Sequence, residues 1–249
     1  MTLFARTRRR IRPAAILAAL LLASGPLAAA PLRFATIDTP PWAWTDPASG
    51  APAGLFPALV ADLERRLGTR MSVVLEPFAR VPHDLQQGRA DCTILVWDPA
   101  WSSFLQRGEQ VASHQFGVIA RKGVPLHGTG DLKGLRVSVL RGLDPGRPFD
   151  GDPAIRVQYD TDYTTGLAKM RLGRLDAVAG ALPTLRYLAR QAGMEAMLGD
   201  TLTLSTVPLP LQCAKNSPSI GRMPALNAAI AAMRRDGTID RLLRQYGYE

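Results

Sequence analysis

The sequence predicts a secreted α/β protein whose mature part consists of two halves of similar build. Three features support this: an N-terminal segment with secretory character, an alternation of strand-like and helix-like segments, and a Gly-Arg-x-Asp turn that occurs twice. Alternating strands and helices are typical of α/β folds with mostly parallel sheets. The repeated turn suggests that the alternation comes in two copies.

The first thirty residues have the layout of a cleaved secretory signal. The apolar run AAILAALLLA over residues 14–23 is followed by small residues at 28–30. The basic residues before it are Arg6, Arg8, Arg9, Arg10 and Arg12. This order is that of a signal peptide, and the run is shorter than the roughly 20 residues that cross a bilayer. We predict that residues 1–30 are a signal peptide and, because no Cys follows the run, that there is no lipid anchor; a buried core helix is the alternative.

The charge of the mature chain argues against nucleic acid as a partner. The whole chain has 30 basic and 21 acidic residues, a net charge of +9. Without the five signal arginines, 25 basic residues stand against 21 acidic ones, a net charge of +4. The remaining arginines are scattered and do not alternate with aromatic residues. Roughly 219 mature residues are enough for two small lobes with their own cores.

The first half of the mature chain alternates strands and helices. Residues 32–37 form an apolar run ended by Asp38 and two prolines, which is typical of a strand. Over residues 54–67 apolar positions recur at helical spacing, and Gly68 ends the helix. Further predicted elements are a strand at 71–75, a short helix at 82–87 and a strand at 91–96.

A similar series begins after Gly130. The predicted strands are 135–140, 155–159 and 175–179, and the predicted helices are 163–172 and 183–191. A strand at 206–214 and two helices at 225–234 and 238–246 complete the chain. No segment has the composition of a disordered linker. We therefore expect strands to join the two halves, an arrangement that favours a hinge.

The two halves contain the same short turn. The segments QGRAD, ending at Asp91, and LGRLD, ending at Asp176, lie 85 residues apart. In each segment the Gly is suited to end a helix and the Asp precedes a predicted core strand. Two such turns in matching contexts indicate two lobes of similar build. Chance recurrence of common turn residues is the alternative.

Five segments in order carry a resemblance to a known family. They are TIDTPPWAWTDPASGAPAGLFPALVADLERRLG, LQQGRADCTIL, DLKGLRVSVLRG, LAKMRLGRLDAVAG and AIAAMRRDGTIDRLLRQYG. Together they resemble the family 3 extracellular solute-binding proteins, which include the amino-acid-binding proteins of ABC importers. The resemblance extends over nearly the whole mature chain.

The resemblance implies a two-lobed periplasmic-binding-protein type II fold with a hinge and an interlobe cleft. Lobe one would be residues 31–115 plus 208–249, and lobe two residues 116–207. The implied function is capture of a small-molecule solute in the periplasm for an ABC transporter permease in the inner membrane, by a monomer that is not an enzyme and has no cofactor. Two alternatives stay open: an accessory or sensory binding protein for a membrane receptor or oxidoreductase, and a dehydratase-like enzyme with Asp98 as general acid.

Cys92 and Cys213 are the two cysteines of the chain. In an oxidising compartment such a pair suggests a disulfide, whereas two buried free thiols are the alternative. The topology implied by the resemblance makes the strand at 91–96 an antiparallel neighbour of the strand at 208–214. A cross-strand disulfide is therefore a hypothesis.

Several residues depart from the pattern of the amino-acid-binding members. The Arg that would bind a ligand carboxylate is missing near Ser103, and the Asp that would bind an amino group is missing near Ala181. Leu95, Val96 and Leu143 stand where hydroxyl side chains are expected. A charge-assisted hydrogen bond contributes roughly 1.5–3 kcal/mol, and a micromolar binder has about 8 kcal/mol in total. An ordinary α-amino acid is therefore not the expected ligand.

The predicted cleft offers aromatic rings and carboxylates instead. Loops that follow core strands carry the four tryptophans, one of them Trp101 beside Asp98. Aromatic faces and a carboxylate suit a cationic, aromatic or polyhydroxylated solute. Each Trp is equally expected to pack inside its lobe, and the Asp to cap the next helix. The predicted ligand-binding residues are Trp42, Trp44, Trp97, Asp98, Arg141 and Tyr163.

No sequence motif indicates a metal site or a catalytic nucleophile. His83, His114 and His127 stand alone, without a second ligand at metal-binding spacing. We expect all three at surface or turn positions. The Gly-rich stretch HGTGDLKG has the wrong spacing for a phosphate loop.

Overall fold

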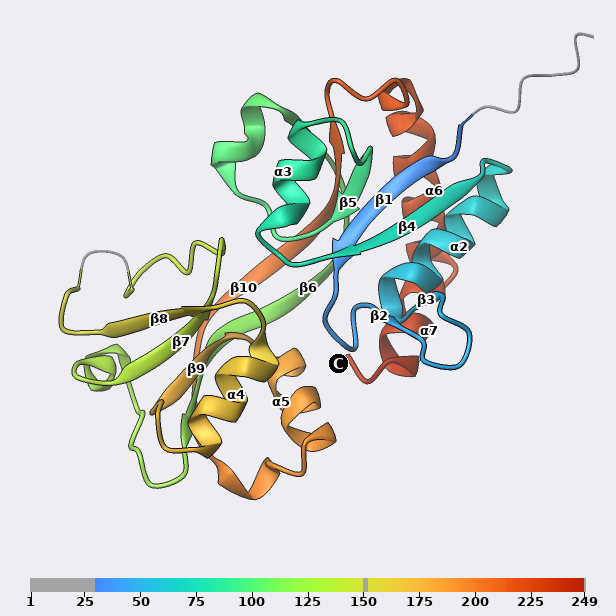
Figure 1. Cartoon of the computed structure of the whole chain (residues 1–249). Coiled ribbons are helices and arrows are strands. Elements are labelled where there is room, and N and C mark those ends of the chain that lie inside the picture. Colours follow the sequence, from blue (N-terminus) through green and yellow to red (C-terminus); the bar gives the residue numbers. More distant parts are fainter. Residues whose placement is uncertain (1–29, 150–151, 249) are drawn as a thin grey trace, which may run out of the picture. The chain divides into compact units, whose positions relative to one another are not determined.

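Two long antiparallel strands form the centre of the fold in the computed structural model, which describes residues 30–149 and 152–248 (Figure 1). They are β6 (Leu105–Arg121) and β10 (Leu198–Ala214), each of 17 residues. Their pairing runs from Leu105 opposite Ala214 to Arg121 opposite Leu198. The predicted signal peptide lies outside the described residues, except for Ala30. None of the described helices combines the length and the apolar character needed to span a membrane.

Among the described residues, one hydrogen-bonded sheet holds eight strands in the order β4-β1-β5-β10-β6-β9-β7-β8. The parallel strands on one side of the central pair belong to lobe one: β1 (Leu32–Ile37), β4 (Met71–Glu76) and β5 (Cys92–Ile94). Those on the other side belong to lobe two: β7 (Arg136–Leu140), β8 (Arg156–Asp160) and β9 (Ala177–Ala181). Strands β5 and β9 pair antiparallel with β10 and β6, so the central pair runs through both lobes.

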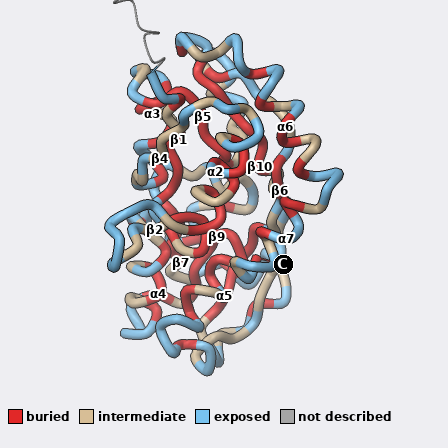
Figure 2. The backbone as a smooth tube through the Cα atoms, turned by 90° about the vertical axis from the view of Figure 1, so that its right-hand side faces the viewer, coloured by how far each residue is buried: buried red, intermediate tan, exposed pale blue. Residues whose placement is uncertain are grey.

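Helices pack against the sheet in both lobes, and buried stretches of the central strands are residues 116–120 of β6 and 209–214 of β10 (Figure 2). Helix α2 buries Leu55, Leu59 and Leu63 on one face and ends at Gly68, whose φ of 58° is the left-handed conformation that glycine adopts readily. The helices of lobe one are α2 (Leu55–Leu67), α3 (Arg80–Gln86), α6 (Met223–Arg235) and α7 (Thr238–Gln245). Those of lobe two are α4 (Tyr163–Arg171) and α5 (Leu182–Gln191). A short hairpin, β2 (Trp44–Thr45) and β3 (Pro52–Ala53), precedes α2.

The predicted two-lobed α/β architecture is confirmed. Most predicted helices and strands lie within two residues of their expected bounds. The sequence did not predict β6, and it predicted only the second half of β10. The first half of β6 alternates irregularly between buried and exposed residues, so it has no strong strand pattern. It is a strand because it pairs with a segment about ninety residues later in the chain.

The turn before β5 holds an ion pair that joins it to β1. The Asp91 carboxylate accepts hydrogen bonds at Oδ2 from the Arg33 backbone N–H, at 2.8 Å, and from the Arg33 Nε, at 3.0 Å. The Arg33 guanidinium also donates to the Gly88 carbonyl at 2.9 Å. Burial by itself would raise the pKa of Asp91, but these bonds and one from the Ser217 hydroxyl hold that pKa below its usual value.

The turn before β9 repeats the same arrangement in lobe two. Asp176 accepts at Oδ2 from the Arg136 backbone N–H and from the Arg136 Nε, both at 2.9 Å. The Arg136 guanidinium donates to the Gly173 carbonyl at 3.0 Å and lowers the pKa of Asp176 to about 2. The two Gly-Arg-x-Asp turns found in the sequence therefore build matching joints, which shows that the lobes share one local design.

The lobes also touch each other away from the central strands, and two of these contacts involve Trp42 and Gly142. The Trp42 indole N–H in lobe one donates a hydrogen bond of 2.9 Å to the Thr184 hydroxyl in lobe two, and both residues are buried. Gly142, after β7, lies against Ala79, which precedes α3: a Cβ on the glycine would stand 2.8 Å from the alanine Cβ. Only a residue without a side chain fits at that contact. The structure is therefore a closed form, in which the two lobes are in contact.

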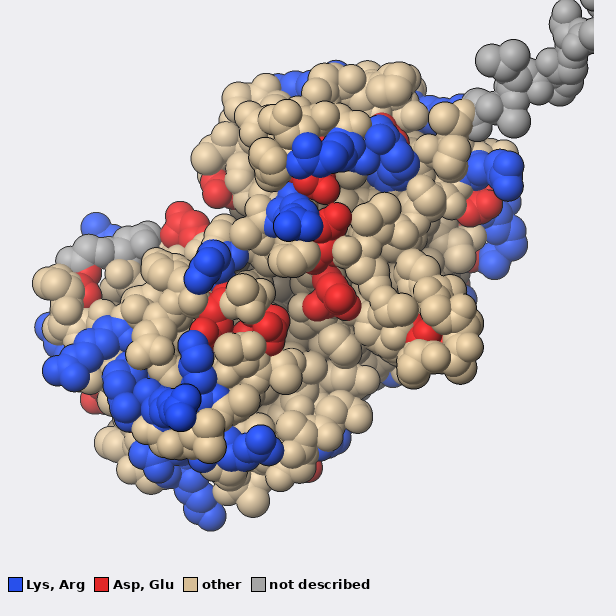
Figure 3. Space-filling view, in the orientation of Figure 1, with Lys and Arg blue, Asp and Glu red and all other residues tan. Residues whose placement is uncertain are grey.

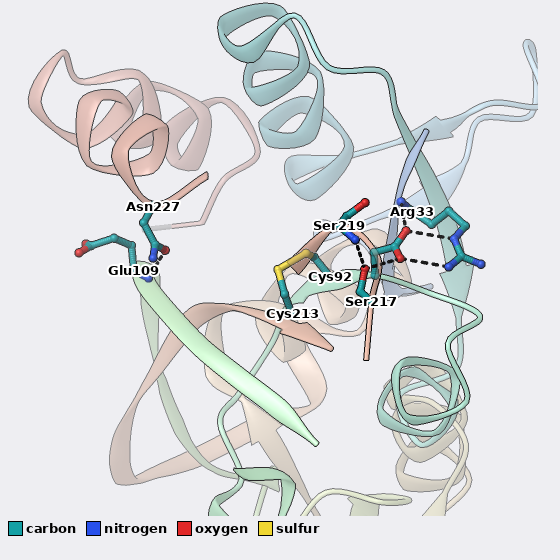
Figure 4. The surroundings of a disulfide bond; sticks show 8 residues. Arg33, Cys92, Glu109, Cys213, Ser217, Ser219 and Asn227 are labelled. Atoms are coloured by element: carbon teal, nitrogen blue, oxygen red, sulfur yellow. Dashed lines mark hydrogen bonds and ion pairs between the residues drawn. A yellow bond between two sulfur atoms is a disulfide. The ribbon is translucent and has the colours of Figure 1, made fainter. Parts of the chain in front are cut away.

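A disulfide fastens the returning strand to lobe one (Figure 4). Cys92 of β5 and Cys213 of β10 are register partners in antiparallel strands, and their sulfur atoms lie 2.02 Å apart. The bond joins residues that are 121 positions apart in the chain. It therefore closes a loop that contains all of lobe two, and cross-links of long loops restrict the unfolded chain most.

Replacing both cysteines by alanine should lower the free energy of unfolding by about 2–5 kcal/mol, because the unfolded chain regains the freedom of the long loop. Urea unfolding of the oxidised protein and of the C92A/C213A variant measures the difference. Thiol titration of the unfolded protein should find free thiols only after reduction. A loss below about 1 kcal/mol would contradict a stabilising role.

Candidate functional site

A cavity of about 190 Å³ lies between the two lobes beside the central strands. Its lining is mostly apolar and comes from both lobes. The residues of lobe one include Ile37, Trp42, Phe56, Phe78 and Ile94, and those of lobe two include Leu140, Leu143, Tyr163 and Ala181. We refer to this space as the main chamber.

The position of the main chamber follows from the strand directions. Ile37 ends β1, Leu140 ends β7 and Ala181 ends β9, and all three line the chamber. The parallel strands of both lobes therefore point their carboxyl ends at the same space. Ligands of open α/β sheets bind at such carboxyl ends.

Four residues that depart from the amino-acid-binding pattern lie on the wall of this one chamber. They are Leu95, Val96, Leu143 and Ala181. Ser103, where the carboxylate-binding Arg would fall, is exposed in the 3₁₀ turn Pro99–Ser103 and does not line the chamber. The chamber thus has apolar side chains where the resemblance implied polar contacts to a ligand.

Aromatic rings pack together around Trp42 at one wall of the chamber. The Trp42 ring stacks on Phe56, with ring centroids 4.7 Å apart, and lies 3.9 Å from the ring of Tyr248. Trp42 is only 2% exposed. The two expected roles of Trp42 therefore coincide, because the ring packs in the core and also lines the chamber. Tyr248 was not anticipated, since it follows the last helix without a recognisable pattern.

His114 contributes a neutral polar group to the main chamber. It lies within β6, half-buried, and not in a turn or at an open surface position, so the expectation for this histidine was wrong. Its Nδ1 is shielded from solvent and has no hydrogen-bond partner among the described residues. Burial lowers the pKa of His114 to about 4. The imidazole is therefore uncharged near neutral pH.

A second hollow of about 90 Å³ adjoins the main chamber. The two spaces share four lining residues, namely Phe78, Val96, Leu143 and Asp144. The second hollow, which we call the side chamber, is completed by Trp97, Asp98, Pro99, Trp101 and Gly142. Two predicted site residues, Trp97 and Asp98, thus lie next to the main chamber.

Asp98 and Asp144 are held in the side chamber by backbone donors. The Asp98 Oδ1 accepts a hydrogen bond of 2.8 Å from Ala100 N and so caps the short 3₁₀ turn. The Asp144 Oδ1 accepts one of 2.9 Å from Gly146 N. The expected capping role of Asp98 is therefore present together with its place in the chamber wall. The Arg107 guanidinium carbon lies 5.8 Å from the centre of the Trp97 ring.

A third hollow, of about 360 Å³, opens between the lobes on the face drawn in Figure 3, where acidic side chains gather. Its walls carry Asp38 from lobe one and Asp162 from lobe two, together with threonines and prolines. Tyr163 lines both this hollow and the main chamber. The Asp162 carboxylate also caps α4 by accepting a hydrogen bond of 2.7 Å from Thr165 N.

Two predicted site residues lie outside all three hollows. Trp44 is in the short β2 strand, where its ring packs edge-on against Tyr246 with centroids 6.2 Å apart. Arg141 is exposed, and its backbone N–H donates to the Asp160 carbonyl at 2.8 Å. The structure therefore gathers Trp42, Trp97, Asp98 and Tyr163 around connected spaces and leaves the other two apart.

The hollows carry negative charge and no positive charge from the described chain. Their lining residues include four aspartates, Asp38, Asp98, Asp144 and Asp162, and neither a lysine nor an arginine. A buried carboxylate of a ligand would find no cationic partner here, and burying an unpaired charge is costly. An apolar or cationic ligand meets no such penalty.

Comparison with known proteins identifies one family. The model of the bacterial extracellular solute-binding proteins, family 3, matches residues 32–249. The match covers nearly all of the chain that follows the predicted signal peptide. No match was found among curated protein sequences.

Solved structures share the fold at low sequence identity. ArgBP from T. maritima is 19% identical with a TM-score of 0.76, and 88% of this chain and 95% of that one are covered. A solute receptor for L-cysteine of Neisseria gonorrhoeae is also 19% identical, with a TM-score of 0.74 and coverages of 87% and 89%. A histidine kinase sensor domain is 16% identical, with a TM-score of 0.74 and coverages of 88% and 96%. These similarities establish the fold.

Replacing His114 by glutamine should make the protein less sensitive to acid. The pKa of His114 falls from 6.5 to about 4 on folding, so between these pH values the unfolded chain binds a proton that the native chain does not. The free energy of unfolding therefore falls as the pH drops through this window. At about pH 4.5 the loss due to this group should be roughly 2–3 kcal/mol for the native sequence and absent in H114Q.

Urea unfolding at neutral pH and at the acidic pH measures this difference. His127 is a matched control, because its side chain is 80% exposed. The H127Q variant should lose as much stability on acidification as the unaltered protein. If H114Q were equally acid-sensitive, the imidazole would not be held neutral by burial.

Proposed function

Because the chain belongs to the bacterial extracellular solute-binding proteins, family 3, we propose that it captures a small solute between its lobes and delivers it to an ABC-type importer. The main chamber carries this proposal. It is enclosed by both lobes, it lies at the carboxyl ends of their parallel strands, and it has a volume suited to a small molecule.

We further propose that the lobes open and close about the central strands, with lobe one as residues 31–115 plus 208–249 and lobe two as residues 116–207. Two features of β10 support a hinge at these boundaries. Pro208 and Pro210 lack a backbone N–H, so they weaken the ladder with β6. The register of the pair also shifts between Leu209 and Pro210 and between Pro210 and Gln212. Such irregularities allow a strand pair to bend.

Closure would be driven by contacts that exist only when the lobes meet. The hydrogen bond from Trp42 to Thr184 and the packing of Gly142 on Ala79 both cross between the lobes. A solute in the main chamber adds contacts to both lobes in this closed form and to one lobe in an open form. Because the solute binds the closed form more tightly than the open form, it shifts the population toward the closed form. A transporter would recognise the closed form.

The disulfide supports a periplasmic location for the proposed activity. Disulfides persist in oxidising compartments such as the periplasm and are rare in the cytosol. The bond between Cys92 and Cys213 suits a chain that residues 1–30 direct across the inner membrane. A monomer is sufficient, because both walls of the chamber come from one chain.

We propose binding without turnover of the solute. A general base needs a partner that orients it and holds its proton. The Nδ1 of His114 has no such partner among the described residues, and the other walls of the main chamber are mostly apolar. The chamber thus has the groups for enclosing a ligand rather than for transferring its protons.

The L143W variant should abolish solute capture, because the larger ring fills space shared by the main and side chambers. Mass spectrometry of small molecules released from purified protein identifies the occupant. A thermal-shift titration with that occupant then measures its binding: at about 100 times the dissociation constant it should stabilise the unaltered protein by roughly 2.7 kcal/mol, and L143W by almost nothing.

The L172W variant is a matched control, because Leu172 is 64% exposed at the end of α4 and lines neither chamber. It should bind the occupant as the unaltered protein does. X-ray scattering should show a more compact molecule when the occupant is added. Equal occupancy in both variants, or a solute that is chemically altered on release, would overturn the proposal.

A further inference from the structure

We propose that the solute is a small monoamine, with an aromatic or branched aliphatic body, one ammonium group and no carboxylate. This inference rests on the proposed function and names the chemistry of the ligand. It departs from the α-amino acids, which carry a carboxylate beside the ammonium group. The walls of the two connected chambers supply the argument.

The main chamber fits the body of such a ligand. Its walls are mostly side chains of Trp, Phe, Leu, Ile and Val, so an apolar group that enters loses much of its contact with water. An apolar cavity of about 150 Å³ is large enough for benzene. A chamber of about 190 Å³ therefore accepts one substituted ring or a branched chain of similar size. The Phe56, Phe78 and Trp42 rings offer it aromatic contacts.

The side chamber fits the ammonium group. Asp144 lines both chambers, and Asp98 lines the side chamber beside it. In each carboxylate a backbone N–H holds Oδ1, while Oδ2 has no hydrogen-bond partner among the described residues. Each carboxylate is thus oriented through its Oδ1, with Asp144 exposed and Asp98 half-buried at the border of an apolar space.

The same walls exclude a ligand carboxylate. None of the described residues around the two chambers is a lysine or an arginine, and burial keeps His114 neutral. The position expected to hold the carboxylate-binding Arg lies at exposed Ser103, outside the chambers. A carboxylate bound here would lose its water without gaining a partner, and Asp144 would repel it. A zwitterion therefore binds more weakly than the corresponding amine.

Isothermal titration calorimetry with four related probes tests this inference. The probes share a phenyl ring: phenethylamine has only an ammonium group, phenylalanine has both charges, 3-phenylpropionate has only a carboxylate, and 2-phenylethanol is uncharged. We expect phenethylamine to bind roughly ten- to a hundredfold more tightly than each of the others, the range expected for one charge-assisted hydrogen bond.

The variants D98N and D144N locate the ammonium group. Asparagine keeps the Oδ1 that accepts the backbone N–H, so the local turns persist while the charge is removed. D144N should weaken phenethylamine binding by about tenfold, and D98N/D144N by more, while 2-phenylethanol binding stays unchanged. D46N is the matched control, because half-buried Asp46 also accepts backbone N–H bonds, from Ala48 and Ser49, and lies outside the chambers.

Each outcome decides between the inference and the function on which it rests. If phenylalanine or 2-phenylethanol binds as tightly as phenethylamine, or if D144N binds the amine like D46N, the monoamine inference is wrong. If no probe binds while L143W still removes a solute found in the purified protein, the inference fails and the capture function stands. If no probe binds and L143W changes nothing, both fail.

Discussion

The antiparallel pairing of β6 with β10 is the constraint on which the rest of the structure depends. Each strand is 17 residues long, and each takes part in the sheets of both lobes. Because the pair is shared, the parallel strands of lobe one and those of lobe two attach to a common axis with their carboxyl ends facing each other. The close approach of the two strands requires Gly117, where a Cβ would lie 2.2 Å from the Leu202 carbonyl oxygen. The chamber between the lobes is a consequence of this pairing.

Each lobe contains a matching Arg–Asp ion pair that holds its parallel strands together beside the central strands. In lobe one, the ion pair of Arg33 with Asp91 links β1 to the turn before β5. In lobe two, the ion pair of Arg136 with Asp176 links β7 to the turn before β9. The Asp groups are partly or wholly withdrawn from water and retain their charge because an arginine and backbone N–H groups bind them. Lobe one has the disulfide in addition. These contacts tie the strands of each lobe together, and the proposed hinge at the prolines of β10 lies between the lobes.

The proposed ligand chemistry follows from apolar side chains at positions where the resemblance implies polar ones. Leu95, Val96, Leu143 and Ala181 occupy the wall of a chamber whose position the fold determines. Since polar groups contribute to affinity only when the ligand satisfies them, their loss changes which ligands are accepted without disturbing the lobes. The polar groups of the two chambers include the neutral imidazole of His114, the hydroxyls of Tyr163 and Ser205, and the carboxylates of Asp98 and Asp144. The proposed amine ligand is the complement of that distribution.

The sequence alone determined the α/β alternation, the two-lobe repeat and the departure from the amino-acid-binding pattern, because periodicity, turn residues and local motifs are properties of short segments. It did not determine β6, whose strand conformation depends on pairing with distant β10. It also did not determine which of Trp42, Trp44, Trp97, Asp98, Arg141 and Tyr163 meet. Trp44 and Arg141 follow core strands as the others do, yet packing places them elsewhere. The neutral state of His114 likewise required the tertiary structure, because desolvation is a property of the surroundings and not of the residue.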